Sequence, residues 1–278
     1  MQETQGIKKK SKERTEDAVH RLVSRFEEWN NDMYFMEVCG DRIVVNHHYS
    51  GIKILNLQLE PVDELNLFDG VMIYHAYSDG DKKRMVLYCA ENGCLVPVDL
   101  AEMKSAVIPL EGAMRQTVFS PVHRWQEKEL LLLDYSGNPY RVDLSEGHVR
   151  FCTEKAGMFG NTASLIRQHR LIHFEDGMLV LETPSGENIR VFDLTGRLIT
   201  EVGKPEGNWH SAVYHDGGLI FASETRIVGV RNHATRFVLE PEPSEYFLKV
   251  KMTGDRHLWV LSSDPSHPEK SRISQYRV

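Results

Sequence analysis

The sequence is poor in cysteine and has no long hydrophobic run. Four cysteines occur in 278 residues, which is too few for a disulfide scaffold and predicts a reducing, cytoplasmic location. No stretch approaches the roughly 18 consecutive apolar residues of a transmembrane helix, and residues 1–25 lack the apolar core of a signal peptide. Positive charge is also scarce, since 33 basic residues face 40 acidic ones and the net charge is −7. Composition therefore argues against a membrane protein and against a nucleic-acid partner.

Motifs for covalent chemistry are missing as well. The sequence contains no Gly-x-Ser-x-Gly, no Walker loop, no Gly-x-Gly-x-x-Gly after a predicted strand and no His-Glu-x-x-His. These absences favour a non-enzymatic protein, and they predict no cofactor.

A short motif recurs along most of the chain. It consists of alternating apolar residues that end in Asp or Asn, at positions 56, 99, 143, 193 and 232, with spacings of 43, 44, 50 and 39 residues. A further step of about 44 residues ends near Tyr276, inside a sixth copy. An apolar run precedes each copy, and turn residues with another short strand follow it. Up to four strands per repeat of this length predict β-propeller blades, and the acidic residues are expected to hold the turns.

Residues 188–197, Asn-Ile-Arg-Val-Phe-Asp-Leu-Thr-Gly-Arg, resemble the third strand and turn of blades in WD40, YVTN and quinoprotein-like propellers. The resemblance covers residues 32–278 and implies a propeller without selecting one family, because the Gly-His and Trp-Asp pairs of WD40 blades and the Tyr-Val-Thr-Asn tetrapeptide are missing. The predicted fold class is all-β, a six-bladed β-propeller over residues 32–278 with an N-terminal amphipathic α-helix. The predicted blades cover about 32–68, 70–110, 115–153, 164–203, 209–240 and 245–278, with an inserted loop at 155–163.

Residues 1–31 are predicted to form a basic tail and an amphipathic helix. Apolar residues recur at helical spacing within residues 12–30; they are Ala18, Val19, Leu22, Val23, Phe26 and Trp29. This face is expected to pack on the propeller, or alternatively to dock a partner or a second copy. Blade 6 has no outer strand before Val278, so it is either three-stranded or completed by the N-terminus, with residues 2–8 as the candidate segment.

The functional face is expected to carry the loops that join second to third strands and fourth strands to the next blade, by analogy with other propellers. Its aromatic and polar loop residues are the candidates for partner binding; they are His47, His48, Tyr49, Tyr135, Asn138, Asn208, Trp209 and His210. A core position for Trp209 is an equal alternative. The sequence thus favours a protein-binding module with a basic partner, since the chain is acidic. One version is a bacterial partner-neutralising, immunity-like protein.

Two other functions stay open. His75, His123, His173 and His215 lie near the ends of four predicted first strands, and four imidazoles around one axis would suit iron, zinc or copper. Asp134, Glu182 and Glu224 end three second strands and would offer oxygen ligands to a divalent cation at the axis. By similarity to lactonase-like and carotenoid-oxygenase-like propellers, such sites imply a metal-dependent hydrolase or oxygenase. The alternation of side chains along strands opposes a shared direction for the histidines. The third hypothesis is a small-molecule or carbohydrate sensor at the channel mouth.

Overall fold

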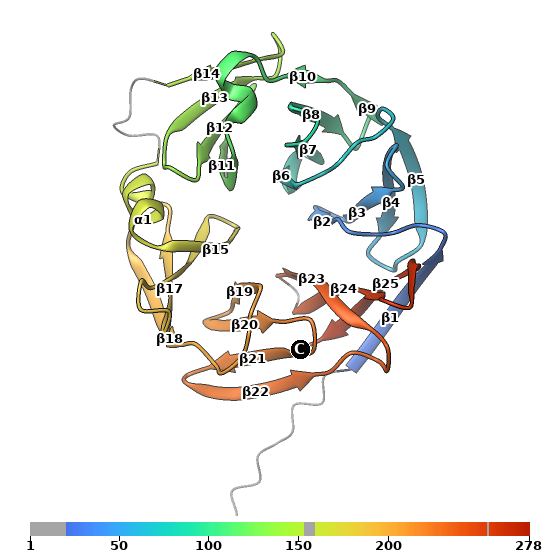
Figure 1. Cartoon of the computed structure of the whole chain (residues 1–278), viewed down its shortest axis with the longest axis vertical. Helices are drawn as coiled ribbons and strands as arrows, with labels where there is room; N and C mark the ends of the chain where they lie inside the picture. Colours follow the sequence, from blue (N-terminus) through green and yellow to red (C-terminus); the bar gives the residue numbers. More distant parts are fainter. Residues whose placement is uncertain (1–20, 153–158, 255) are drawn as a thin grey trace, which may run out of the picture.

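The computed structural model describes residues 21–152, 159–254 and 256–278, which form six antiparallel sheets around a central axis (Figure 1). The predicted six-bladed, all-β propeller is confirmed. Each sheet is one blade, and its first strand lies nearest the axis. Within the described ranges, no helix combines the length and the hydrophobicity needed to cross a membrane.

The strands follow the chain blade by blade. Blade 1 contains β2 (Met36–Cys39), β3 (Arg42–His47), β4 (Gly51–Asn56) and β5 (Pro61–Asn66). Blade 2 contains β6 (His75–Asp79), β7 (Arg84–Cys89) and β8 (Cys94–Asp99), with β9 (Lys104–Ser105) and β10 (Ile108–Pro109) both paired to β8. Blade 3 contains β11 (Phe119–Trp125), β12 (Glu129–Asp134), β13 (Pro139–Asp143) and β14 (His148–Phe151).

Blade 4 contains β15 (Arg170–Glu175), β16 (Met178–Glu182), β17 (Asn188–Asp193) and β18 (Leu198–Gly203). Blade 5 contains β19 (Ser211–His215), β20 (Gly218–Ala222), β21 (Ile227–Arg231) and β22 (Ala234–Leu239). Blade 6 contains β23 (Tyr246–Thr253), β24 (His257–Asp264), β25 (His267–Arg277) and β1 (Arg21–Trp29). The short helices are η1 (Gly80–Lys82), η2 (Gly112–Gln116) and α1 (Thr162–Gln168), which begins at the end of the predicted 155–163 insertion.

The hydrophobic core lies between neighbouring blades. Most residues of the second strands are buried, because both faces of each sheet are covered by adjacent sheets. This explains why the sequence shows unbroken apolar runs there instead of alternation. The acidic residues at strand ends hold turns as expected. Oδ1 of Asp99, Asp143 and Asp193 each accepts two backbone N–H groups within the next four residues.

The N-terminal helix is not formed over residues 21–29, which are the strand β1; the remainder of the predicted helix, residues 12–20, lies outside the described residues. Ser24, Phe26 and Glu28 are partly buried, while Arg25 and Trp29 point to the surface, which is the alternation of a strand. The unpaired backbone of β25 supplies an edge on which β1 pairs over its whole length. This long-range pairing outweighs the helical spacing of the apolar residues.

Blade 6 is therefore completed by an N-terminal segment, as one of the two alternatives predicted. The segment is Arg21–Trp29, however, and the predicted residues 2–8 lie outside the described residues. The propeller consequently begins before the predicted boundary at residue 32. Because β1 leads directly into blade 1 and pairs with the last strand of the chain, it joins the first blade to the last (Figure 1).

Candidate functional site

Four tyrosines lie on the loops of blades 1 to 3 at one end of the propeller, and we call them the mouth tyrosines: Tyr34, Tyr49, Tyr74 and Tyr135. Tyr74 and Tyr135 line the central channel. The rings of Tyr34 and Tyr49 stack with centroids 5.7 Å apart. The Tyr34 hydroxyl donates to the Val71 carbonyl at 3.3 Å and accepts from the Ile73 N–H at 3.2 Å, so it fixes the loop that leads to Tyr74. Burial and the nearby Tyr74 raise the pKa of Tyr135 to about 12. The four rings thus form two neighbouring pairs, Tyr34 with Tyr49 on blade 1 and Tyr74 with Tyr135 on blades 2 and 3.

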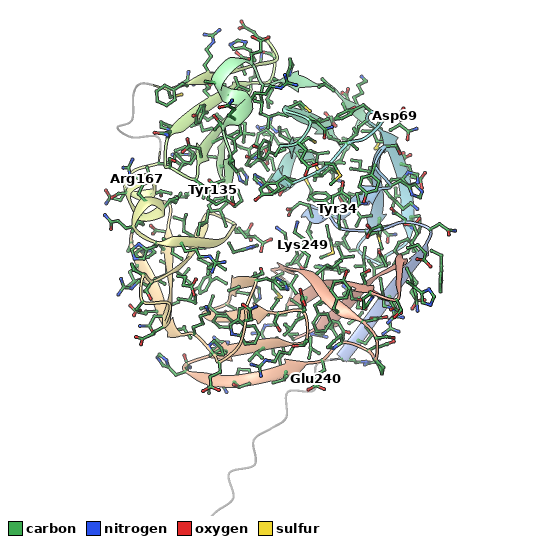
Figure 2. All side chains as sticks on the ribbon, viewed as in Figure 1. Tyr34, Asp69, Tyr135, Arg167, Glu240 and Lys249 are labelled. Atoms are coloured by element: carbon green, nitrogen blue, oxygen red, sulfur yellow. The ribbon has the colours of Figure 1, made fainter. Side chains whose placement is uncertain are left out.

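The fold explains the positions of these rings. Tyr34 and Tyr74 stand just before the first strands of blades 1 and 2, whereas Tyr49 and Tyr135 lie in the turns between second and third strands. Both kinds of loop open on the same end of a propeller. The side chains of Tyr49, Tyr74 and Tyr135 are 44%, 55% and 43% exposed. Figure 2 shows Tyr34 and Tyr135 on opposite sides of the central opening, with Lys249 between them.

The channel below the mouth tyrosines is a cavity of about 520 Å³, lined by first strands. Lys251 of β23 lies at its wall and is buried. Its Nζ lies 2.8 Å from Glu37 Oε1 and 3.3 Å from Glu175 Oε1, so one ammonium pairs with carboxylates from blades 1 and 4. Burial alone would lower the pKa of Lys251, but Glu175 and Glu37 raise it above its usual value. Burial opposes ionisation of Glu175, yet Lys251 and His173 lower its pKa to about 2.

Lys249 lies two residues earlier on the same strand and has a different environment. Among the described residues, no carboxylate lies within ion-pair distance of its ammonium; the contact seen is with the Phe35 ring, whose centroid is 5.1 Å from Nζ. Burial, and secondarily the positive charge of Lys251, lowers the pKa of Lys249 to about 8. Phe35 directly precedes β2, at the mouth end of blade 1. A cation without an ion pair among the described residues, whose charge Glu37 offsets only in part, thus faces the channel near its aromatic mouth.

The eight predicted partner-binding residues lie in several different places. Tyr49 and Tyr135 belong to the mouth tyrosines, and the exposed residues Asn208 and His210 lie on the loop before blade 5. Trp209 between them is a core residue with 7% exposure, and its Nε1 donates to the Pro205 carbonyl at 2.7 Å. The Arg226 guanidinium covers the ring, with Cζ 5.0 Å from its centroid. The core alternative for Trp209 is the one observed, because this ring fills the space beside β20.

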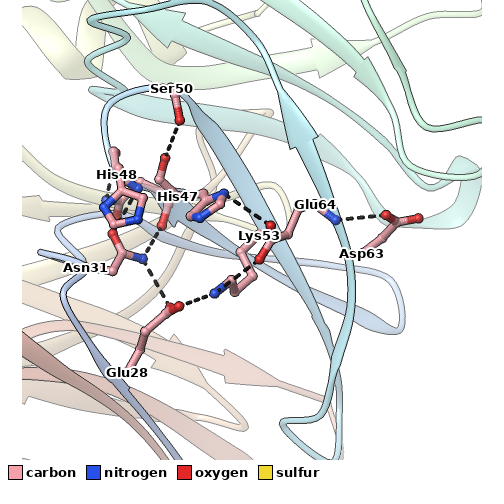
Figure 3. A network of polar contacts seen from close by, with 9 residues as sticks. Glu28, Asn31, His47, His48, Ser50, Lys53, Asp63 and Glu64 are labelled. Carbon is pink, nitrogen blue, oxygen red and sulfur yellow. Dashed lines mark hydrogen bonds and ion pairs between the residues drawn. The ribbon is translucent and has the colours of Figure 1, made fainter.

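His47 and His48 lie at the seam between blades 6 and 1, where a polar network joins β1 to blade 1 (Figure 3). Glu28 pairs with the Lys53 ammonium, which also lies 3.3 Å from Glu64. His47 Nδ1 is 3.5 Å from Glu64, and the His48 N–H donates to the side chain of the adjoining Asn31 at 2.9 Å. His47 thus faces the seam, while the exposed His48 is tied to it through its backbone.

Asn138 is held by Asp134, a residue predicted for the alternative metal site. The backbone N–H and Nδ2 of Asn138 donate to the Asp134 carboxylate at 2.7 and 2.8 Å. Glu182 pairs with Arg170 and Lys204. Glu224 is exposed in a turn, and its carbonyl accepts the Phe247 N–H. Asp134 and Glu182 are therefore already bound to local donors, and the structure does not bring the three acidic strand ends together.

Three of the four predicted histidines line the channel: His75, His123 and His173. The fourth, His215, lies in a second cavity of about 500 Å³ beside Asp216. Both His123 ring nitrogens face backbone carbonyls, of Pro121 at 2.9 Å and Ser78 at 3.3 Å.

In the described ranges, one group of three potential metal ligands has its ligand atoms within 4.8 Å of one another; it is Asp143, Glu146 and His148, in an outer turn. None of the seven predicted metal ligands belongs to it. The arrangement of the histidines and acidic strand ends therefore does not assemble the predicted metal sites.

Sequence reasoning missed the channel charges and two mouth tyrosines. Tyr34 and Tyr74 occupy equivalent places before first strands, a repeat signal that was available. Lys249 and Lys251 interrupt the apolar sequence Phe-Leu-Lys-Val-Lys-Met at period two. Two charges on one face of an inner strand indicate a polar channel wall. Glu37 and Glu175 carried no such local signal, because their partner Lys251 lies on a different blade.

Comparisons with known proteins agree with the fold. No protein-family model matches the sequence, and no curated protein matches it. A chain in the "Crystal Structure of Mitotic Checkpoint Complex" aligns with a TM-score of 0.63 at 11% identity, over 100% of this chain and 99% of that chain. The "Crystal structure of WD40 beta propeller domain of Doa1" aligns with a TM-score of 0.58 at 10% identity, over 92% of this chain and 96% of that chain. At these identities the similarity shows the fold alone, a WD40-like propeller.

Proposed function

We propose that this protein is a protein-interaction module that binds its partner with the face carrying the mouth tyrosines. The observation that carries the proposal is the group of exposed, anchored rings at one end of the propeller. Tyrosine gives a large contact area at a small entropic cost, because only two side-chain torsions must be fixed. Anchored aromatic side chains are also the residues that most often dominate the binding energy of protein interfaces.

The surroundings of the mouth tyrosines support this proposal. Val118 is 51% exposed, and its carbonyl accepts the Tyr135 N–H at 3.2 Å, so an apolar side chain extends the aromatic surface over blade 3. A WD40-like fold presents such loops from a rigid ring, and the solved structures of similar fold include a chain of a multiprotein complex. The neighbour's partners are its own, so the partner of this chain has to be identified by experiment.

The experiment is affinity purification from the native source with mass spectrometry, followed by calorimetry with the purified candidate partner. The test variant is Tyr74→Ala with Tyr135→Ala, and the matched control is Val62→Ala with Val238→Ala, two exposed apolar residues on outer strands β5 and β22. The tyrosine variant is expected to weaken binding by at least about tenfold, as loss of hot-spot residues does. Equal affinity of the tyrosine variant and the wild type would place the interface elsewhere.

The narrower hypothesis, an immunity-like protein with a basic partner, stays a prediction that rests on the net charge of −7. The same purification tests it, because it requires a partner of high isoelectric point. A docking helix over residues 12–30 does not fit the structure, since β1 occupies residues 21–29 of that segment.

A further inference from the structure

The central channel has the size of a small-molecule site. Its volume of about 520 Å³ falls within the roughly 300–1,000 Å³ of ligand pockets in proteins. Apolar side chains share its wall with the charged and imidazole groups, among them Ala76, Phe174, Leu248 and Val250. Tyr74 and Tyr135 stand at its entrance. A ligand with an apolar body and a polar end would find both kinds of contact here.

Charge in the channel is distributed unevenly between its two lysines. Lys251 is neutralised by Glu37 and Glu175, which leaves it little capacity for a further anion. Lys249 has no such partner in the described ranges and rests its ammonium against Phe35. A partly buried cation without a direct ion pair is costly, and a bound anion would reduce that cost.

His75 supplies a second polar group without a partner in the same cavity. Its Nε2 is buried and makes no hydrogen bond with any residue in the described part of the chain. Burial, and secondarily the charge of Lys249, lowers the pKa of His75 to about 3, so its imidazole is neutral at physiological pH. A neutral imidazole has one N–H, for which the Ser120 backbone competes, so Nε2 donates to a ligand oxygen in the tautomer that gives up the Ser120 contact. His75 and Lys249 both line this cavity.

From these contacts we propose that the channel binds a small organic monocarboxylate, with its carboxylate on Lys249 and His75 and its apolar body toward the mouth tyrosines. A single negative charge matches Lys249, since Lys251 is already paired and Arg124, the remaining lysine or arginine of the wall, is exposed to solvent. A phosphate dianion would bring a second negative charge toward Glu37 and Glu175, which already share Lys251. The proposal assigns a ligand class to the small-molecule alternative and does not depend on the protein partner.

The test uses ¹⁹F NMR titration of the full chain with 4-fluorobenzoate, and with 4-fluorobenzamide as the neutral analogue of the same shape. Wild-type protein is expected to bind the benzoate at least about tenfold more tightly than the benzamide, because the charge-assisted contact is lost in the amide. Lys249→Met is expected to abolish this preference. His75→Phe keeps a ring beside Tyr77, whose centroid lies 4.9 Å from that of His75, and is expected to weaken benzoate binding several-fold.

The control variant is Lys128→Met, which removes the same charge from an exposed turn between β11 and β12. It is expected to bind both probes like the wild type. Equal benzoate affinity of Lys249→Met and wild type would overturn the proposal, as would no detectable benzoate binding at millimolar protein and probe. Tighter binding of 4-fluorophenyl phosphate than of the benzoate would overturn the assignment to a monocarboxylate.

Discussion

Two lysines on one strand show how neighbouring blades decide what a residue does. Lys249 and Lys251 are two positions apart on β23, so both face the channel. Lys251 meets carboxylates from two other blades and joins three blades electrostatically. Lys249 meets the Phe35 ring. Lys249 therefore destabilises the fold as long as no anion is bound to it, whereas Lys251 stabilises the contacts among three blades.

Replacement of Lys249 by methionine is expected to stabilise the protein at pH 7. The variant removes a poorly compensated charge while keeping most of the side-chain volume, and we expect the free energy of unfolding to rise by roughly 1–3 kcal/mol. Urea denaturation measures this change, with Lys128→Met as the exposed control that should stay within about 0.5 kcal/mol of wild type. A loss of stability in Lys249→Met would mean that the ammonium makes a favourable contact in the native channel.

The pH dependence of the free energy of unfolding gives a second measurement of the destabilisation by Lys249. The pKa of Lys249 is about 8 in the folded protein and about 10.5 in the unfolded chain, so the unfolded chain binds more protons between these values. The Lys249 contribution therefore makes the free energy of unfolding rise as the pH increases from about 8 to 10.5, and Lys249→Met should lack this part. The other charged or titratable groups that line the same channel are Glu37, Tyr74, His75, His123, Arg124, Tyr135, His173, Glu175, Asp176, His210 and Lys251. These groups are present in the wild type and in Lys249→Met, so the difference between the two pH profiles reports the contribution of Lys249.

At this scale the sequence predicted the site only where a local pattern sufficed. Tyr49 and Tyr135 were identifiable because aromatic residues within polar turns are unusual and tend to be exposed. Trp209 had the same appearance but belongs to the core, since its burial depends on the position of Arg226 and of β20. The same cluster also includes Val180 and Val191 of blade 4, so the burial of Trp209 depends on a neighbouring blade, which a loop sequence does not encode.

At the scale of elements, β1 shows how strand pairing overrides a local helical pattern. The apolar spacing of residues 18–29 fits a helix, but isolated helices of this length are marginal in water. Pairing with β25 satisfies a full row of backbone groups that would otherwise remain at an open edge. The six repeats could be counted from the sequence because each copy is local. The identity of the closing strand could not, because its partner lies about 250 residues away.

The contact of Glu28 with Lys53 is expected to hold β1 against blade 1, and a double-mutant cycle can measure it. The variants are Glu28→Gln, Lys53→Met and the combination. The side chains are 16% and 10% exposed, so the pair is mostly shielded from solvent. We expect a coupling energy of about 1–2 kcal/mol from urea denaturation, more than the 0.2–1 kcal/mol of surface pairs. The exposed pair Lys104 and Glu102 serves as the control cycle. A coupling as small as that of the control would show that backbone pairing alone closes the ring.

At the scale of the molecule, the ring makes every blade depend on both of its neighbours. The hydrophobic clusters combine residues of adjacent blades, and the cluster at the seam joins Met36 and Ile43 of blade 1 to Trp259 and Ile273 of blade 6. A closed ring has no end blades, unlike open repeat arrays that can unfold from their termini. A substitution that destabilises the seam should therefore also lower the stability of the blades on the opposite side of the ring.

Phe26→Ala in β1 tests this dependence, because Phe26 packs against the seam cluster. We expect a loss of roughly 1–3 kcal/mol, below the range for a fully buried phenylalanine, since Phe26 is only partly buried. Hydrogen exchange with mass spectrometry in mild urea reports blades separately. The slowest amides of β12 in blade 3 and of β24 in blade 6 should lose the same free energy of protection. Phe151→Ala, on the outer strand of blade 3 with 49% exposure, is the control and should change both strands little. If β24 alone loses protection while β12 retains it, the blades unfold independently and closure by β1 does not make the propeller a single cooperative unit.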